Sequence, residues 1–384
     1  MNRLPASNRD RTGRPGRATT GPDLSEPTRR LLLTPTYLDA RRHFRAGLDA
    51  LRRTDPLHPA AVLLPGTEAL QDLRRSLGDA LGVRLYTFYD LAAAVLDAGG
   101  FPVHRLEDIA LRRLLRRVLD DLAAAGSLAV FAPLREKPGF LGAVLDWLRE
   151  MESQGITPED GAVHAAAVHA AAAHADEEIA RALAEIYTQY ETELRDRAAA
   201  DADGSLRLAA GALESDPAVF RMPGRLAVLG FDQFNPLQRR LLRALASRCD
   251  DVAVYLAWDP DRPETSLAHA RAAETRRTLL ADLPLVEEIV PRSDEADPTL
   301  ARLHRDLFEN RDQGPPPDAG GSLRLVEAPS REVEVRFVLR EVKKLLLAGE
   351  DPAEIAVLAP EPAVYHPIVR AVAGEYGLPI ALDR

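Results

Sequence analysis

The most chemically suggestive residues follow a short apolar run. Leu226–Leu229 ends at Gly230, Asp232 comes two residues later, and an amphipathic helical pattern starts near Pro236. Such a run is typical of a buried strand, and the loop after a strand of a doubly wound sheet lies at the edge where ligands bind. A carboxylate there could contact a metal ion, or it could cap the next helix or accept hydrogen bonds from turn amides. Capping or turn formation is the favoured interpretation of Asp232.

A second candidate loop, Thr34–Asp39, follows the first apolar run of the chain. A phosphate-binding loop needs glycines whose backbone N–H groups wrap the phosphate, a lysine for the β- and γ-phosphates, and a hydroxyl for magnesium. Thr34–Asp39 has no glycine and no lysine, and Lys137 is the first lysine of the chain. No loop ending in Gly-Lys-Ser/Thr occurs anywhere in the sequence. ATP hydrolysis at this position is therefore not expected.

Two further groups carry metal-binding side chains. His164, His169 and His174 recur every five residues in an alanine-rich stretch. On a helix each is rotated by about 140° from the last, so the rings do not converge on one ion. Cys249 is the only cysteine, which excludes an intrachain disulfide and a multi-cysteine metal or iron–sulfur site in this sequence. We predict no metal site here.

Aromatic residues at the ends of the predicted strands have two possible roles. Tyr37, Phe231 and Trp258 could stack on nucleobases, but aromatic side chains at strand ends more often close the core. Asp259, beside Trp258, has the same alternatives as Asp232. The structural role is favoured for all four.

The charge is unevenly distributed. The 384 residues carry a formal net charge of −10, which is not the basic signature of a nucleic-acid module. Residues 1–53 nevertheless contain 12 arginines and 5 acids. This basic end could hold phosphates or be a disordered tail. Only three of the 49 basic residues are lysines, a bias typical of a GC-rich genome, so arginine abundance alone does not indicate phosphate binding.

The composition suits a soluble globular protein, with 46% apolar and 28% charged residues. No apolar run approaches the roughly 18 to 20 residues of a membrane helix. The N-terminus also lacks the apolar stretch of a secretory signal. We expect a cytoplasmic protein without membrane contact.

A scaffold of alternating strands and helices must position these residues. Strands are predicted at Leu31–Thr34, Ala61–Leu64, Arg84–Thr87, Leu226–Gly230 and Val252–Ala257. Amphipathic helical patterns separate them, and this alternation indicates an α/β fold with a mostly parallel sheet. Between residues 107 and 200 only helical periodicity is present.

The predicted organisation has six segments. They are a disordered basic tail (1–28), a first α/β part (29–104), a helical insertion (105–223), a second α/β part (224–312), a Pro/Gly-rich linker (313–321) and a further α/β region (322–384). In the last region, strands predicted at Leu323–Glu327, Ile355–Ala359 and Pro379–Leu382 alternate with two helices. Three strands make half a domain, so this second α/β domain is expected to be incomplete and the chain truncated or a fragment.

Short motifs give the chain a specific resemblance. Residues 229–238, Leu-Gly-Phe-Asp-Gln-Phe-Asn-Pro-Leu-Gln, resemble the motif Asp-Glu-Phe-Gln-Asp-Thr-x-Pro-Leu-Gln of UvrD-type superfamily 1 helicases. Leu229 and Gly230 stand where that motif has the acidic pair for magnesium and the attacking water. The segments 86–91, 327–334 and 376–380 are similar to segments of AddB/RexB, the B subunit of the AddAB/RexAB helicase-nucleases. Over residues 31–384 the chain thus resembles the N-terminal helicase-like region of an AddB/RexB-type protein, a member of the PD-(D/E)XK nuclease family.

The resemblance implies a RecA-like, superfamily 1 helicase-like fold with a degenerate nucleotide pocket. The implied pocket residues are Thr34, Pro35, Thr36, Leu229, Gly230, Asp232 and Gln238. It implies no catalytic residue, metal ligand or cofactor in this chain. The metal ion, and often an iron–sulfur cluster, would belong to a C-terminal nuclease domain that this sequence lacks.

The implied function is a non-catalytic module that holds single-stranded DNA or duplex ends in double-strand break repair and recombination. Its partners would be an AddA-type helicase-nuclease motor and the nuclease. Candidate phosphate contacts are Arg41, Arg42, Arg112 and Arg116, although a solvated helix face is favoured for the last two. The alternatives are a protein-interaction scaffold without DNA contact, favoured by the net charge of −10, an active ATP-dependent helicase, and an α/β protein unrelated to repair.

Overall fold

A computed structural model describes residues 28–382, with gaps at 79–80, 138, 159–176, 217, 223, 261, 263–265, 293–296, 308, 310–313 and 316–320. They form two compact units, one of residues up to 294 with 305–311 and one of residues 295–304 with 312 onward. The predicted tail, except Thr28, most of the predicted linker and the three spaced histidines lie outside the described residues. No described helix has both the length and the apolar character needed to cross a membrane.

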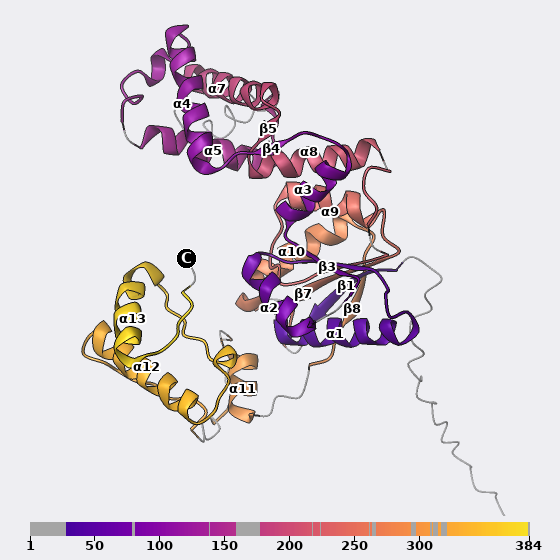
Figure 1. The fold of residues 1–384 in the computed structure, drawn as a ribbon, viewed down its shortest axis with the longest axis vertical. Coiled ribbons are helices and arrows are strands. Elements are labelled where there is room, and N and C mark those ends of the chain that lie inside the picture. Colours follow the sequence, from indigo (N-terminus) through magenta and orange to yellow (C-terminus); the bar gives the residue numbers. More distant parts are fainter. Residues whose placement is uncertain are drawn as a thin grey trace, which may run out of the picture. The chain divides into compact units, whose positions relative to one another are not determined.

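The first unit is built on a six-stranded sheet (Figure 1). Its strand order is β3-β2-β6-β7-β1-β8, and its strand pairings are parallel. The strands are β1 (Thr28–Thr34), β2 (Ala60–Leu63), β3 (Val83–Tyr86), β6 (Arg225–Val228), β7 (Asp251–Ala257) and β8 (Val286–Ile289). The predicted α/β fold with a mostly parallel sheet is confirmed. The sequence pattern does not reveal β8, because all four of its residues are exposed at the sheet edge.

Helices cover both faces of this sheet, because its inner strands are apolar on both sides. Successive residues of β1 belong to opposite cores: Leu32 to one and Leu33 to the other. The first core lies against α1 (Tyr37–Thr54) and α2 (Thr67–Leu77). The second lies against α3 (Phe88–Ala98), α8 (Ala202–Ser215), α9 (Pro236–Ala246) and α10 (Ala270–Asp282), and Figure 1 shows α1 and α9 on opposite sides of the strands.

A separate helical core follows α3 in the chain. It is formed by α4 (Asp108–Ala124), η1 (Ala129–Phe131), α5 (Phe140–Ser153) and α7 (Glu177–Asp196). A parallel pair of two-residue strands, β4 (His104–Arg105) and β5 (Ala199–Ala200), closes this segment. The helix α8 lies within the predicted insertion, yet Leu206 and Leu213 of α8 pack in the sheet core.

The second unit is mainly helical. It contains α12 (Arg331–Leu347) and α13 (Pro362–Tyr376), which pack through a small apolar cluster that includes Leu339 and Val372. The remaining short elements in the described part of the chain are η2 (Leu267–His269), α11 (Pro298–Asp306) and η3 (Pro352–Glu354).

The three strands predicted after residue 322 are wrong. The segments Leu323–Glu327, Ile355–Ala359 and Pro379–Leu382 have no strand pairing in the described structure. Leu325 is 102% exposed and Leu358 is 95% exposed. A strand requires a neighbouring backbone that completes its ladder, and an apolar run of the right length does not supply one.

Candidate nucleotide site at the carboxyl edge of the sheet

A cavity of about 300 Å³ lies at the carboxyl edge of the sheet, where a RecA-like fold would place its nucleotide. Thr34, Gly230 and Asp232 line it, together with apolar side chains from α1, α2 and β7. The other predicted pocket residues, Pro35, Thr36, Leu229 and Gln238, do not line the cavity. The structure therefore brings together three of the seven residues that the resemblance assigned to a degenerate pocket.

The loop between β1 and α1 is too short to wrap a phosphate. Only Pro35 and Thr36 separate the last residue of β1 from the first residue of α1. Thr36 is the N-cap: its Oγ1 accepts a hydrogen bond from the Asp39 amide at 3.0 Å and donates one to Asp39 Oδ2 at 2.8 Å. The Asp39 side chain is buried, so a carboxylate already occupies the positive end of the helix dipole where a phosphate would bind.

Leu229 and Gly230 stand where the UvrD-type helicase motif has its acidic pair, and neither position has room for an acidic side chain. Leu229 is fully buried in the core against α1, and its backbone N–H donates to Leu63 O at 3.0 Å. Gly230 has a φ of +81°, and a Cβ built on it would lie 3.2 Å from the Tyr37 ring and 3.3 Å from Pro65 Cδ. Positive φ and these short approaches both favour glycine over a residue with a side chain.

Asp232 is exposed and pairs with Arg271 of α10 at 2.9 Å. Its backbone carbonyl accepts a hydrogen bond from Thr275 Oγ1 at 2.7 Å. The helix cap considered for Asp232 belongs instead to Asn235, so that alternative is wrong. The side chain of Asp232 links the loop to α10.

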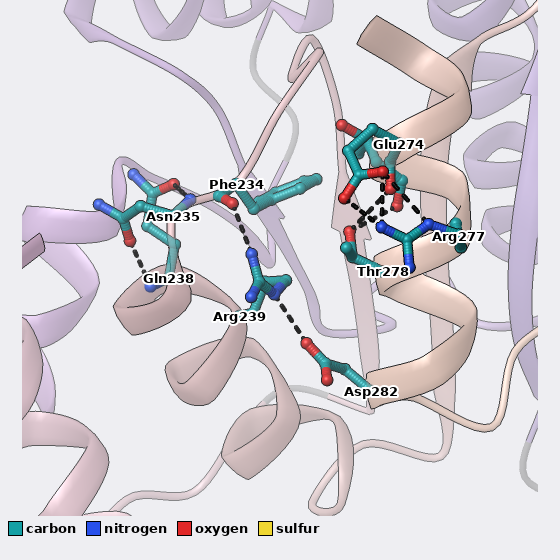
Figure 2. A network of polar contacts seen from close by, with 9 residues as sticks. Phe234, Asn235, Gln238, Arg239, Glu274, Arg277, Thr278 and Asp282 are labelled. Atoms are coloured by element: carbon teal, nitrogen blue, oxygen red, sulfur yellow. Dashed lines mark hydrogen bonds and ion pairs between the residues drawn. The ribbon is translucent and has the colours of Figure 1, made fainter. Parts of the chain in front are cut away.

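Asn235 and Gln238 form a reciprocal capping box at the start of α9 (Figure 2). The backbone N–H of Gln238 donates to Asn235 Oδ1 at 2.8 Å, and the backbone N–H of Asn235 donates to Gln238 Oε1 at 3.1 Å. Arg239, next in the helix, donates to Phe234 O at 2.9 Å and to Asp282 of α10 at 2.7 Å. The polar residues of this motif therefore hold a turn and two helices in place.

The two family-like motifs of this unit also pack against each other. The Phe88 ring lies edge-on to Phe231 at 5.2 Å and to Phe234 at 6.2 Å, and Phe231 stacks on Phe234 at 5.0 Å. Thr87 and Asp90 form a second capping box, at the start of α3. Sequence reasoning missed both boxes, although a Thr-x-x-Asp and an Asn-x-x-Gln pattern before an apolar run are their signals.

The capping box predicts the effect of one substitution directly. Replacing Asn235 by alanine leaves the backbone N–H of Gln238 without its acceptor. We expect a loss of about 1 kcal/mol of unfolding free energy. Urea unfolding followed by far-UV circular dichroism measures this loss. Asn235→Asp is the matched control and should retain nearly full stability, because aspartate caps equally well. Equal stability of the alanine and aspartate variants would contradict a capping role.

The other strand-end residues have structural partners. Trp258 is buried and stacks on His269 at 4.1 Å, and Arg276 lies 4.9 Å from the Trp258 ring. Asp259 is buried and pairs with Arg292 at 2.5 Å. Tyr37 is the exposed member of the three aromatic candidates, at 39%, and burial of its other side raises the pKa of its hydroxyl.

The four candidate arginines lie on two helices that belong to different cores. On α1, Arg41 pairs with Asp72 at 2.5 Å and lies 5.9 Å from the Tyr37 ring, and Arg42 is exposed. On α4, Arg112 pairs with Asp108 at 2.7 Å, and Arg116 is exposed. The structure does not bring the two pairs together in one site.

The fold and the loops at the carboxyl edge define the class: this is an α/β protein of the RecA-like type. Residues 71–283 match the sequence model of the family described as "ADDB, N-terminal", and the chain belongs to that family. The family resemblance predicted from the motifs is confirmed.

Three relatives illustrate the extent of the similarity, and each is the B component of an ATP-dependent helicase/deoxyribonuclease. The chain is 30% identical over 370 residues to the one from Moorella thermoacetica, covering 88% of this chain and 31% of that protein. It is 29% identical to the one from Desulforudis audaxviator (87% and 30% covered) and 24% identical to the one from Bacillus subtilis (87% and 30% covered). The chain spans about three tenths of the length of these relatives.

Proposed function

We propose that this chain is a helicase-like module that contacts DNA without hydrolysing ATP, within a helicase-nuclease system for double-strand break repair and recombination. The observation that carries the proposal is the β6–α9 loop. It has the position of a helicase motif, yet its residues are a buried leucine, a positive-φ glycine and a capping box. The names of the relatives supply the helicase and deoxyribonuclease context.

The proposed absence of ATP chemistry rests on the geometry of both loops. The two-residue β1–α1 loop leaves no backbone cradle, and the Asp39 carboxylate opposes a phosphate electrostatically at the same helix end. The proposed partners are DNA, as single strands or duplex ends, and an AddA-type motor. The metal ion and iron–sulfur cluster of the nuclease reaction are proposed to belong to a nuclease domain outside this sequence, and the proposed compartment is the cytoplasm.

DNA contact is expected to run mainly through arginine and phosphate. Fluorescence anisotropy of labelled single-stranded DNA and of duplex ends measures it, with the prediction that log Kd rises linearly with log salt and does not respond to ATP. Each phosphate contact contributes about 0.9 to that slope for duplex DNA. Arg42→Ala tests α1 and Arg116→Ala tests α4. The variant on the helix that contacts DNA should lower the slope by about 1. Arg277→Ala on α10 is the control, because Arg277 is exposed and pairs with Glu274 on its own helix.

Two results would replace the proposal. A folded chain that binds no DNA at low salt, but captures a helicase motor protein, would favour the scaffold alternative. Phosphate release from ATP that is stimulated by DNA would favour an active helicase.

A further inference from the structure

A buried glutamate lies where the helical core meets the sheet core. Glu152, in the last turn of α5, is 0% exposed, and neither of its carboxyl oxygens has a hydrogen-bond donor among the described residues. Two more buried acids lie beside it: Glu191 of α7, at 5% exposure, and Asp201, the N-cap of α8, at 2%. The helix α8 packs on α3 and α9 of the sheet unit, so this cluster joins the two cores.

Each neighbouring acid has at least one hydrogen-bond donor, although Glu191 Oε1 has none among the described residues, whereas both oxygens of Glu152 lack one. Asp201 Oδ1 accepts from the Gly204 amide at 2.8 Å, and Asp201 Oδ2 accepts from the Tyr190 hydroxyl at 3.2 Å. Glu191 pairs with Arg207 of α8. Arg207 lies near both Glu191 and Glu152, and its hydrogen bond goes to Glu191.

The position of Glu152 favours a proton shared with a neighbouring acid. A Cβ built on Gly204 would lie 3.0 Å from Asp201 Oδ1 and 3.5 Å from Glu152 Oε1, so the two carboxyl groups face the same point. Ionisation of two neighbouring carboxyl groups away from water is costly, because desolvation and like charge each oppose it. A protonated carboxyl group, in contrast, donates the hydrogen bond that the cluster lacks.

We propose that Glu152 is protonated in the folded protein and donates its O–H to the Asp201 carboxylate, forming a proton-dependent link between α5 and the start of α8. Burial is the main cause that raises the pKa of Glu152 well above its usual range, and the charges of Asp201 and Glu191 add to it. The titratable and charged groups that face Glu152 are Tyr187, Tyr190 and Glu191 from α7 and Asp201 and Arg207 from α8.

The sign of the pH dependence follows from the raised pKa of Glu152. The folded state retains a proton that the unfolded chain releases near the ordinary glutamate pKa of about 4.3. The stabilisation is complete below that value and is lost as the pH rises through the folded pKa. Between the two pKa values, the equilibrium constant for opening this junction rises by up to about tenfold per pH unit.

Amide hydrogen exchange across a pH series tests the link in the full chain. After correction for intrinsic exchange, the amides at the end of α5 and the start of α8 should open more readily as the pH rises. Glu152→Gln keeps the shape of the acid, and its side-chain amide can donate to Asp201 at every pH. The slope at the junction should therefore fall to the part due to Asp203 in the first turn of α8, whose pKa burial and Asp201 raise to about 6. Glu150→Gln is the control: Glu150 is exposed on the same helix, and that variant should keep the wild-type slope.

A second variant guards against misfolding of the first. Asp201→Asn keeps a good N-cap and removes one charge, so the slope should also fall while α8 stays protected. A wild-type slope in both Glu152→Gln and Asp201→Asn would overturn the proposal. The proposal would also be overturned if a chelator increased amide exchange at the junction and Mg²⁺ or Ca²⁺ reversed the increase. A bound cation would then balance the charge of the acids in place of the proton.

Discussion

Leu229→Asp is expected to unfold the sheet unit without creating ATPase activity. The substitution installs the first acid of the resembling helicase motif at a position that is 0% exposed and packed against α1 and α2. The new carboxylate would lie in a cluster of apolar side chains, so we expect a loss of about 4 to 5 kcal/mol of unfolding free energy. A typical domain is stable by only about 5 to 15 kcal/mol, so this loss ranges from about a third to nearly all of its stability.

Guanidinium unfolding, followed by circular dichroism and by the fluorescence of buried Trp258, measures this loss, and phosphate release from ATP is measured in parallel. Leu229→Met is the matched control and should cost less than about 1.5 kcal/mol, because it conserves volume. Leu229→Asn has the shape of aspartate without the charge and should fall between the two. An aspartate variant that unfolds at the wild-type denaturant concentration and hydrolyses ATP would refute the structural role of Leu229.

Phe88→Ala is expected to lower the unfolding free energy by about 3 to 5 kcal/mol. Phe88 is 2% exposed and touches both Phe231 and Phe234, so its removal opens a cavity between the start of α3 and the β6–α9 loop. The edge-on contact with Phe231 should add a coupling of about 0.5 to 1.5 kcal/mol in a double-mutant cycle of Phe88→Ala and Phe231→Ala. The same unfolding measurement gives the unfolding free energies of the wild type, both single variants and the double variant.

Phe101→Ala serves as the control for ring removal. Phe101 is 44% exposed, and its loss should cost less than about 1 kcal/mol. If Phe88→Ala cost no more than Phe101→Ala, or if the cycle showed no coupling, the two motifs would not support each other through this aromatic contact.

The sequence determined the fold class and the family. Short apolar runs separated by amphipathic patterns specify strands buried between helices, and this physical requirement placed β1, β2, β3, β6 and β7 within a few residues of their observed bounds. It also determined that the β1–α1 loop lacks glycine and lysine, because that chemistry depends on residue type alone. The apolar pattern failed where strand formation depends on a partner, as at the exposed edge strand β8 and at the three segments after residue 322.

Only the tertiary structure decided what the candidate residues do. The sequence shows that Asn235 precedes a helix and that Glu152 is acidic, but burial and partners come from chain segments far away in sequence. Phe88 meets Phe231 and Phe234 across some 140 residues, and Glu152 meets Asp201 across some 50. The charge state of Glu152 and the rigid setting of Leu229 and Gly230 follow from these long-range contacts, because desolvation and steric exclusion depend on the surrounding atoms and not on local sequence.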